Sequence, residues 1–283
     1  MSIQNPTFLK KQTLLLSLLV VISLSAKAQL KEFLRGQDVY WSGWIQENRY
    51  SNALDEIWRS PVMQEYEIPS KTNLRVAHFV DFDADGKKDI IVMGNLGGES
   101  ESILFFRNNG LDYEEVLSIM GELVYVSDYK MGQPLAFAIN HYGCCEDNTD
   151  NFEYYVPVGH GDDFHFELSQ KISHLKSGTF PKEFMSPIGF YTTQEKYKLR
   201  MDPSIPEETG NFADYSQIAA IYPPMSEGVA FAKKKDATGR LWYFVIMENN
   251  QAPLEESVHK GFNNPAPHRT MGWMSSRFLE EYE

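Results

Sequence analysis

Short apolar runs follow one another along most of this 283-residue chain, and polar turn residues separate them. The runs are rich in aromatic and β-branched residues, which favour extended backbone, whereas Gly, Asn, Asp and Pro, which favour turns, lie between them. Short strands at such regular spacing are typical of a mostly β fold, as a sandwich, a barrel or a partial propeller. Strands are predicted at residues 74–80, 90–93, 103–107, 114–117, 123–126, 135–140, 152–158 and 164–169.

A stretch punctuated by proline, residues 180–189, interrupts this series, and the pattern then restarts with a different character. Composition shifts of this kind mark domain boundaries, and we place one at residue 187. The predicted organisation is an irregular β domain, residues 29–187, followed by a smaller domain, residues 188–283. Because no fixed-period repeat is visible, a full propeller of repeated blades is not expected.

The first residues have the features of a secretory signal peptide. Lys10 and Lys11 precede the apolar run 14–24, and Ala26-Lys27-Ala28 supplies small residues at the cleavage site. The alternative is a membrane anchor, but the run is about a dozen residues, short of the roughly 20 that span a bilayer. We therefore predict a signal peptide over residues 1–28 and an exported protein, periplasmic or secreted, with no membrane span after cleavage.

Removing residues 1–28 takes away three lysines and no acid, which changes the formal charge from −13 to −16. A charge of this sign repels phosphate backbones, so nucleic acid is not expected as a partner. It suits cations or basic partners. It is equally explained by the solubility that an acidic surface confers.

Cys144 and Cys145 are the only cysteines, and they are adjacent. They cannot join distant segments, so the fold must rest on its apolar core, for which 42% hydrophobic residues are sufficient. In an oxidising compartment two neighbouring thiols can form a vicinal disulfide, which we favour, or remain reduced and buried. No essential chemistry is predicted for either cysteine.

The segment 81–89 has acidic residues at alternate positions: Asp81, Asp83, Asp85 and Asp89. Calcium prefers six to eight oxygen ligands, and this loop offers four carboxylates together with the backbone carbonyl of Lys87. Gly86 permits a sharp turn, because it lacks a Cβ. A solvated acidic turn without metal is the alternative, but carboxylates so close together repel one another. We predict a Ca²⁺ site.

This loop lies between two apolar runs, residues 74–80 and 90–93, which makes it a strand–loop–strand hairpin. It is not an EF-hand loop, because Val92 occupies the twelfth position, where a bidentate Glu would close the site. The sequence here resembles the FG-GAP and VCBS calcium hairpins of extracellular β proteins, over residues 74–110. The resemblance implies an ion with a structural role.

Three segments near the C-terminus, residues 197–204, 239–247 and 272–279, resemble the bacterial SH3-like domain. The shared pattern opens with Leu-Arg and a following Pro, has a central Trp-Tyr strand and closes with Gly-Trp-x-Ser-Ser. Phe278 replaces the usual closing Tyr, and a long insertion, residues 248–271, separates the last strands. The resemblance implies a small β-barrel that binds cell-wall peptide or another envelope ligand.

Exposed aromatic residues that flank a groove would be the physical means of such binding. The candidates are Tyr215, Tyr222 and Trp273, and Tyr222, before Pro223-Pro224, is expected to be the most exposed. The alternative for Trp273 is a place in the barrel core, because aromatic residues in strands more often pack inside.

Three functions are compatible with these features. The leading hypothesis is a non-enzymatic binding protein of the envelope, stabilised by calcium, that recognises cell-wall peptide or a protein partner. An alternative is a periplasmic inhibitor of a lysozyme-type peptidoglycan hydrolase, because an acidic protein suits capture of a basic hydrolase. A second alternative is a peptidoglycan hydrolase whose catalytic domain is not recognised. No nucleophile elbow, phosphate-binding glycine loop or zinc protease motif is present, so no catalysis is predicted.

Overall fold

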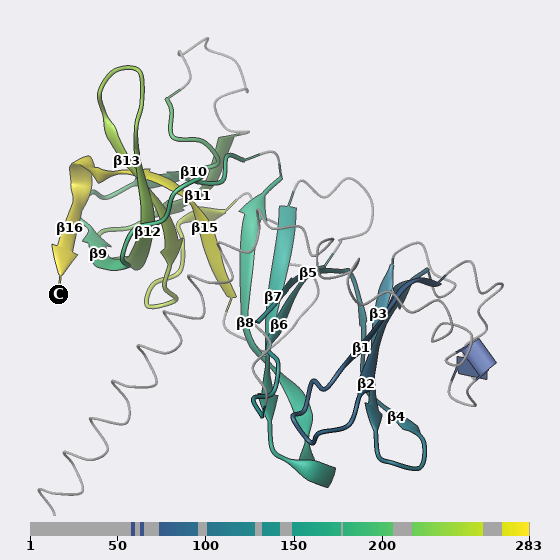
Figure 1. The fold of residues 1–283 in the computed structure, drawn as a ribbon. Coiled ribbons are helices and arrows are strands. Elements are labelled where there is room, and N and C mark those ends of the chain that lie inside the picture. The colour runs from purple at the N-terminus through teal and green to yellow at the C-terminus, as the bar shows by residue number, and fades with distance from the viewer. Residues whose placement is uncertain are drawn as a thin grey trace, which may run out of the picture.

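The structure is a computed structural model of the whole chain (Figure 1). It describes residues 58–59, 63–64, 74–95, 101–127, 132–141, 149–176, 178–205, 217–256 and 268–282. The predicted signal peptide, Tyr215, Cys144 and Cys145 lie outside the described residues. Strands dominate the described part, which confirms the prediction of a mostly β protein. No helix in that part is both long and apolar enough to cross a membrane.

The first sheet is an antiparallel meander of four strands, β1(Leu74–Val80), β2(Asp89–Gly94), β3(Ser102–Asn108) and β4(Tyr113–Met120), in that order. Every residue of β2 is buried, whereas β4, at the edge of the sheet, has no buried residue. Continuous burial of a strand requires cover on both of its faces. The sequence of β2 meets this requirement, because Ile-Ile-Val-Met is apolar at consecutive positions.

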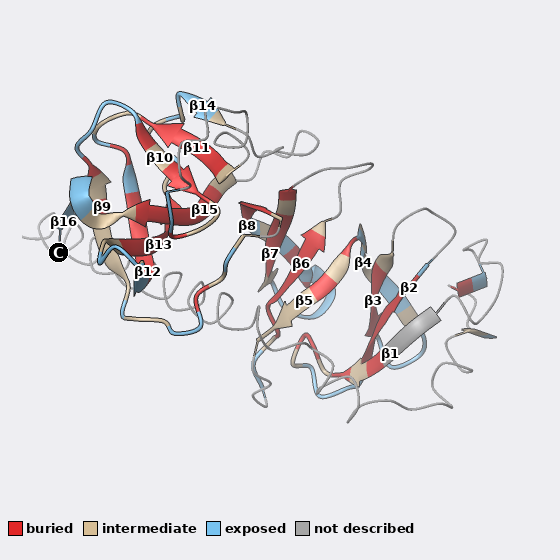
Figure 2. Ribbon diagram, turned by 90° about the horizontal axis from the view of Figure 1, so that it is seen from above, coloured by how far each residue is buried: buried red, intermediate tan, exposed pale blue. Residues whose placement is uncertain are grey.

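The second sheet continues with β5(Glu122–Val126), β6(Phe137–His141), β7(Thr149–Val158) and β8(His165–Leu175), again antiparallel neighbours. A core of aromatic and aliphatic side chains lies between the two sheets and is drawn from both, so the sheets pack face to face as in a sandwich. In Figure 2, β2, β3, β6 and β7 are coloured as buried over much of their length. All eight strands predicted before residue 170 are present, and β8 extends six residues further than expected.

Eight strands form the remainder of the described chain. They are β9(Ile188–Thr192), β10(Tyr197–Arg200), β11(Ile218–Tyr222), β12(Glu227–Lys235), β13(Leu241–Met247), β14(Glu255–Glu256), β15(His268–Ser275) and β16(Leu279–Tyr282). Their order is β16-β9-β12-β13-β15, with β10, β11 and β14 continuing from β15. Among the described strands, β14 and β16 end the sheet without pairing with each other. In the described residues the sheet is therefore open, and it does not close into the predicted small β-barrel.

The two halves of the chain are joined by strand pairing. The start of β15, His268 to Thr270, runs parallel to Lys171, Ile172 and Ser173 of β8, so β5 to β16 form one twelve-stranded sheet. In Figure 1, β15 lies beside β8 between the two halves. Parallel pairing needs a long connection, which here spans the predicted boundary at residue 187.

The core is also shared across that boundary. One apolar cluster contains Trp242, Phe244 and Trp273 from the C-terminal strands together with Phe152 and Ile172 from β7 and β8. The C-terminal strands also contain an apolar cluster almost entirely their own, which includes Phe190, Tyr222 and Val245, so only part of the core expected for a C-terminal domain is shared across the boundary. The sequence shows that these side chains are apolar, but it does not show which surface covers them.

His174 lies in this junction. Its burial leads us to expect that the free energy of unfolding depends on pH. Its ring is 1% exposed, neither of its nitrogens has a hydrogen-bond partner, and it packs against Phe180 with ring centres 4.6 Å apart. Burial lowers the pKa of His174 to about 4, although Asp202 opposes this shift. Between pH 6.5 and 4 the unfolded chain therefore takes up a proton that the folded chain does not.

We expect this difference in proton uptake to reduce the free energy of unfolding as the pH falls from 6.5 towards 4, by up to about 3 kcal/mol. Urea unfolding at several pH values measures the effect. The His174→Phe variant, which cannot titrate, should lose this part of the pH dependence, whereas His165→Gln, at an exposed position, should retain it. An unchanged slope in His174→Phe would contradict the assignment.

Candidate calcium site

The acidic loop connects β1 to β2, and its own side chains hold its shape. Asp81 Oδ2 accepts a hydrogen bond from the Gly86 N–H at 3.0 Å, and Asp83 Oδ1 accepts one from the Asp85 N–H at 3.1 Å. Ala84 and Gly86 have φ angles of 63° and 88°. Carboxylates that accept local backbone hydrogen bonds favour tight turns with positive φ, so the loop winds back towards its own start.

Three of the predicted ligands converge in this loop. Asp81, Asp83 and Asp89 each offer one carboxylate oxygen, and the three oxygens lie within 4.8 Å of one another. Asp81 Oδ1 is buried and has no hydrogen-bond partner. Buried polar atoms are normally paired, and an oxygen without a partner beside two further carboxylates fits a hard cation. The donor set, oxygen only and anionic, is the one that calcium prefers.

Asp89 is the most enclosed of the three acids. Its side chain is fully buried, Oδ2 accepts a hydrogen bond from the Phe82 N–H at 2.9 Å, and Oδ1 accepts one from the Asn108 N–H at 2.8 Å. Burial nevertheless raises the pKa of Asp89 to about 7, and the charges of Asp83 and Asp85 contribute. An ionised Asp89 is therefore poorly compensated by the protein's own groups, and a bound cation would supply the missing charge.

Burial also raises the pKa of Asp83, with a further contribution from the charges of Asp85 and Asp81. Its side chain is only 6% exposed. Repulsion within the cluster and loss of hydration act in the same direction, since both disfavour the ionised form. The fold thus holds Asp83 and Asp89 where their ionised forms are destabilised. A bound cation would remove this destabilisation.

Asp85 does not join the three converging acids. Its carboxylate forms an ion pair with Lys87 Nζ at 2.8 Å. Although burial opposes ionisation of Asp85, the hydrogen bonds from Lys87 hold its pKa below the usual value. Of the four predicted carboxylates, three therefore converge in this structure, and the fourth has the ammonium group of the neighbouring Lys87 as its partner. The Lys87 carbonyl remains a predicted ligand.

Phe82, between the first two acids, anchors the loop in the core. Its side chain is fully buried, and its ring centre lies 5.7 Å from that of Phe105 in the first sheet and 5.4 Å from that of Phe166 in the second. Its carbonyl oxygen accepts a hydrogen bond from the Leu135 N–H at 2.9 Å. The loop is thereby connected to both sheets. This role was not predicted from the sequence. The available signal was a large apolar residue between two candidate ligands, which indicates that the loop packs against the core.

Arg107 on β3 is a second functional neighbour that sequence reasoning missed. It is 7% exposed, it donates hydrogen bonds to the Gly161 carbonyl and to Glu114 Oε2, and the latter measures 2.8 Å. Gly161 begins the short 3-10 helix η2(Gly161–Asp163) between β7 and β8. Arg107 therefore ties the first sheet to the β7–β8 turn beside the acidic loop. A lone Arg in a strand carries no sequence signal for such a contact.

The predicted binding aromatics are placed differently from the expectation. Tyr222 is 3% exposed, so the prediction that it lies on the surface is wrong. All five residues of β11 are buried, because both faces of this strand are covered. Trp273 is 1% exposed and its Nε1–H donates a hydrogen bond to the Thr179 carbonyl at 2.6 Å, which makes it a core residue. Tyr215 lies outside the described residues.

No protein-family model, curated protein or solved structure matches the chain. The resemblances to FG-GAP and VCBS hairpins and to SH3-like domains remain predictions that rest on the residues quoted for them. The features that bear on function are the converging acids of the loop, the anchor provided by Phe82 and the shared core between the halves.

Proposed function

We propose that this chain is an exported binding protein of the cell envelope, stabilised by one Ca²⁺ ion and without catalytic activity. The observation that carries the calcium part of this proposal is the convergence of Asp81, Asp83 and Asp89, with one carboxylate oxygen of each within 4.8 Å of the others. Asp81, Asp83 and Asp89 would hold the ion, and the Lys87 carbonyl is a further candidate ligand. Water would complete the six to eight oxygens that calcium requires.

The proposed role of calcium is structural. Neutralising the three acids removes their repulsion, and it fixes the loop in the conformation that places Phe82 between the two sheets. Both oxygens of Asp89 already accept backbone hydrogen bonds, so this acid is poorly placed to exchange protons with a substrate. These contacts favour a stabilising ion over a catalytic one.

The proposed ligand is cell-wall peptide or an envelope protein, and this part rests on the resemblance to SH3-like domains. The binding surface cannot consist of Tyr222 and Trp273, because both are buried in the core. The acidic composition remains compatible with capture of a basic hydrolase, which is the alternative partner.

Incubation of the mature chain, residues 29–283, with purified peptidoglycan in the presence of calcium tests the proposal. We expect the protein to sediment with the peptidoglycan and to release no soluble fragments. Release of fragments would show a hydrolase and contradict the absence of catalysis. Failure to sediment, together with inhibition of lysozyme, would replace the proposal by the inhibitor function.

A further inference from the structure

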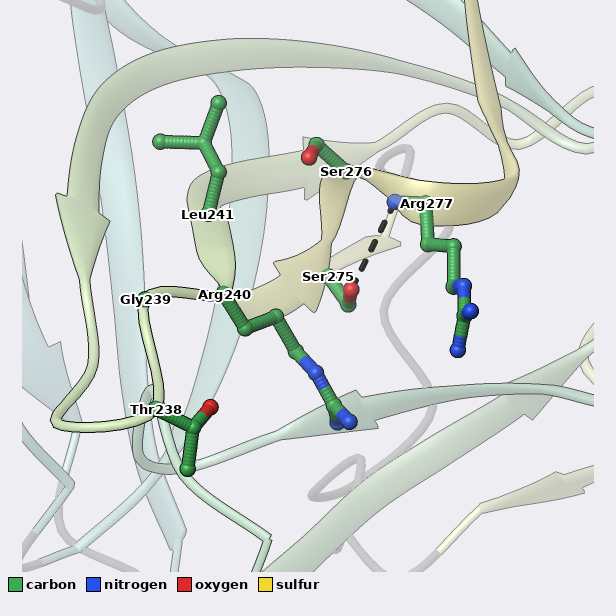
Figure 3. A pocket seen from close by; sticks show the side chains of 7 residues that line it. All are labelled: Thr238, Gly239, Arg240, Leu241, Ser275, Ser276 and Arg277. Carbon is green, nitrogen blue, oxygen red and sulfur yellow. Dashed lines mark hydrogen bonds between the residues drawn. The ribbon is translucent and has the colours of Figure 1, made fainter.

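A pocket opens on the C-terminal half, between the turn that joins β12 to β13 and the short 3-10 helix η4(Ser276–Phe278) (Figure 3). Its polar lining consists of the side chains of Thr238, Arg240, Ser275, Ser276 and Arg277. In Figure 3 the two arginine side chains extend in the same direction, with the Ser275 hydroxyl between their origins. Among the described residues, none of those that line the pocket is acidic.

Each of the two guanidinium groups lies near an aromatic ring, and in the described residues neither is paired with an acid. Arg240 lies over the Trp242 ring, 5.9 Å from its centre, and Arg277 lies over the Phe278 ring at the same distance. In the described part of the chain, neither arginine has an ion pair. Stacking of this kind orients a guanidinium but leaves its N–H donors available.

Three lysines lie close in sequence to the turn that lines the pocket, although the chain as a whole is acidic. Lys233, Lys234 and Lys235, at the end of β12 beside the pocket turn, are all exposed, whereas the chain as a whole has a formal charge of −13. Asp236 is the acid of this turn, and its oxygens accept hydrogen bonds from the Arg240 N–H at 3.0 Å and from Trp242 Nε1 at 2.9 Å. Both carboxylate oxygens of Asp236 are therefore used to hold the turn.

Hydroxyl groups add further donors to the pocket. Ser275 Oγ accepts a hydrogen bond from the Arg277 N–H at 3.4 Å, which leaves its own hydrogen free to donate. Ser276 is half-buried at the first position of η4. The two guanidinium groups and the neighbouring hydroxyls are all hydrogen-bond donors, and no carboxylate is among the lining residues. Such a set of donors suits an oxyanion.

We propose that this pocket binds a carboxylate group, and specifically the free carboxylate of a peptide ligand. The inference rests on the proposed function, because it names the chemical group by which a cell-wall peptide would be recognised. A guanidinium group pairs with a carboxylate through two parallel hydrogen bonds. A carboxylate carries a single charge, so the field of this acidic chain opposes its approach less than that of a phosphate or a polyanion.

Binding of two short peptides to the full mature chain tests the proposal. The probes are acetyl-Ala-Ala with a free C-terminal carboxylate and the same peptide with a C-terminal amide, and inorganic phosphate serves as the competing oxyanion. NMR of the arginine Nε–H groups reports binding at the pocket. We expect the carboxylate peptide to shift the signals of Arg240 and Arg277, and the amide to leave them unchanged.

Variants then establish which residues bind. The double substitution R240Q with R277Q should weaken binding of the carboxylate peptide by about tenfold or more, because it removes both charge-assisted contacts. Lys182→Gln removes an exposed charge outside the pocket and should bind as the unaltered chain does. Both variants must keep the melting temperature of the unaltered chain. If the double variant unfolds, the single substitution R277Q, at an exposed position, is used in its place.

Equal shifts by the carboxylate and amide peptides, shifts by neither, or tighter binding of phosphate would each overturn the proposal. Its failure can be told apart from that of the proposed function. Sedimentation with peptidoglycan that survives R240Q with R277Q would leave the envelope-binding function in place and refute this pocket. Carboxylate binding without sedimentation would support the pocket and refute the cell-wall function.

Discussion

Residues 188–283, expressed alone, should be far less stable than the same residues in the full chain, although they keep most of the apolar cluster around Phe190 and Val245. Trp242, Phe244 and Trp273 bury their rings in a cluster that Phe152 and Ile172 complete from the other half of the chain. Each large apolar side chain that loses its cover forfeits roughly 1.5–3 kcal/mol. Losses at these three side chains together, about 4.5–9 kcal/mol, are comparable with the roughly 5–15 kcal/mol that stabilises an ordinary domain. The fragment should also lose the edge pairing of β15 with β8.

Circular dichroism and urea unfolding of the fragment measure this effect. We expect the fragment to unfold at a much lower urea concentration than the full chain, and to bind a dye that reports exposed apolar surface. A longer fragment, residues 149–283, restores β7 and β8 and serves as the control, because it returns the strand that pairs with β15 and the side chains that cover the tryptophans. A shorter fragment that unfolds cooperatively, with the melting temperature of the full chain, would show that the two halves are independent.

Calcium should stabilise the full chain, and removal of calcium by a chelator should lower its melting temperature. An ion that binds only the folded form adds about 2.7 kcal/mol at a free concentration one hundred times its dissociation constant. Asp83→Asn should abolish this response, because it removes one of the three converging charges. Thermal unfolding with calcium and with chelator, followed for each variant, measures the difference.

Asp162→Asn is the matched control, because Asp162 is an exposed acid outside the loop, and its response to calcium should be unchanged. Asp85→Asn separates the two possible ligand sets. A full response in this variant supports the three acids that the structure brings together, whereas a lost response supports the four acids of the sequence pattern. A full response in Asp83→Asn would refute the site.

The anchor of the loop explains why a local site should have a global effect. Phe82 contacts aromatic rings of both sheets, and Arg107 joins β3 to the β7–β8 turn. Movement of the loop would therefore disturb the packing between the sheets as well as the hairpin itself. Stabilisation by calcium should accordingly appear in the unfolding of the whole sandwich, and not only as local protection of residues 81–89.

The strands were predictable because their signals are local. Residues such as Ile90, Ile91 and Val92 favour extended backbone through their own side chains, and the turn at Asn108 to Gly110 follows from residues within a few positions. The acidic loop was found for the same reason, since alternate carboxylates in one short segment identify the chemistry of the ligand that they can hold.

The sequence by itself determined the mostly β fold, the position of most strands and the acidic loop, all of which depend on neighbours along the chain. Only the tertiary structure decided that Asp85 pairs with Lys87, that Tyr222 is buried, and that β15 joins β8. The physical reason is that burial and pairing depend on which distant surfaces meet. An apolar or aromatic residue has the same identity whether it covers a core or faces water, and only the packed chain distinguishes the two.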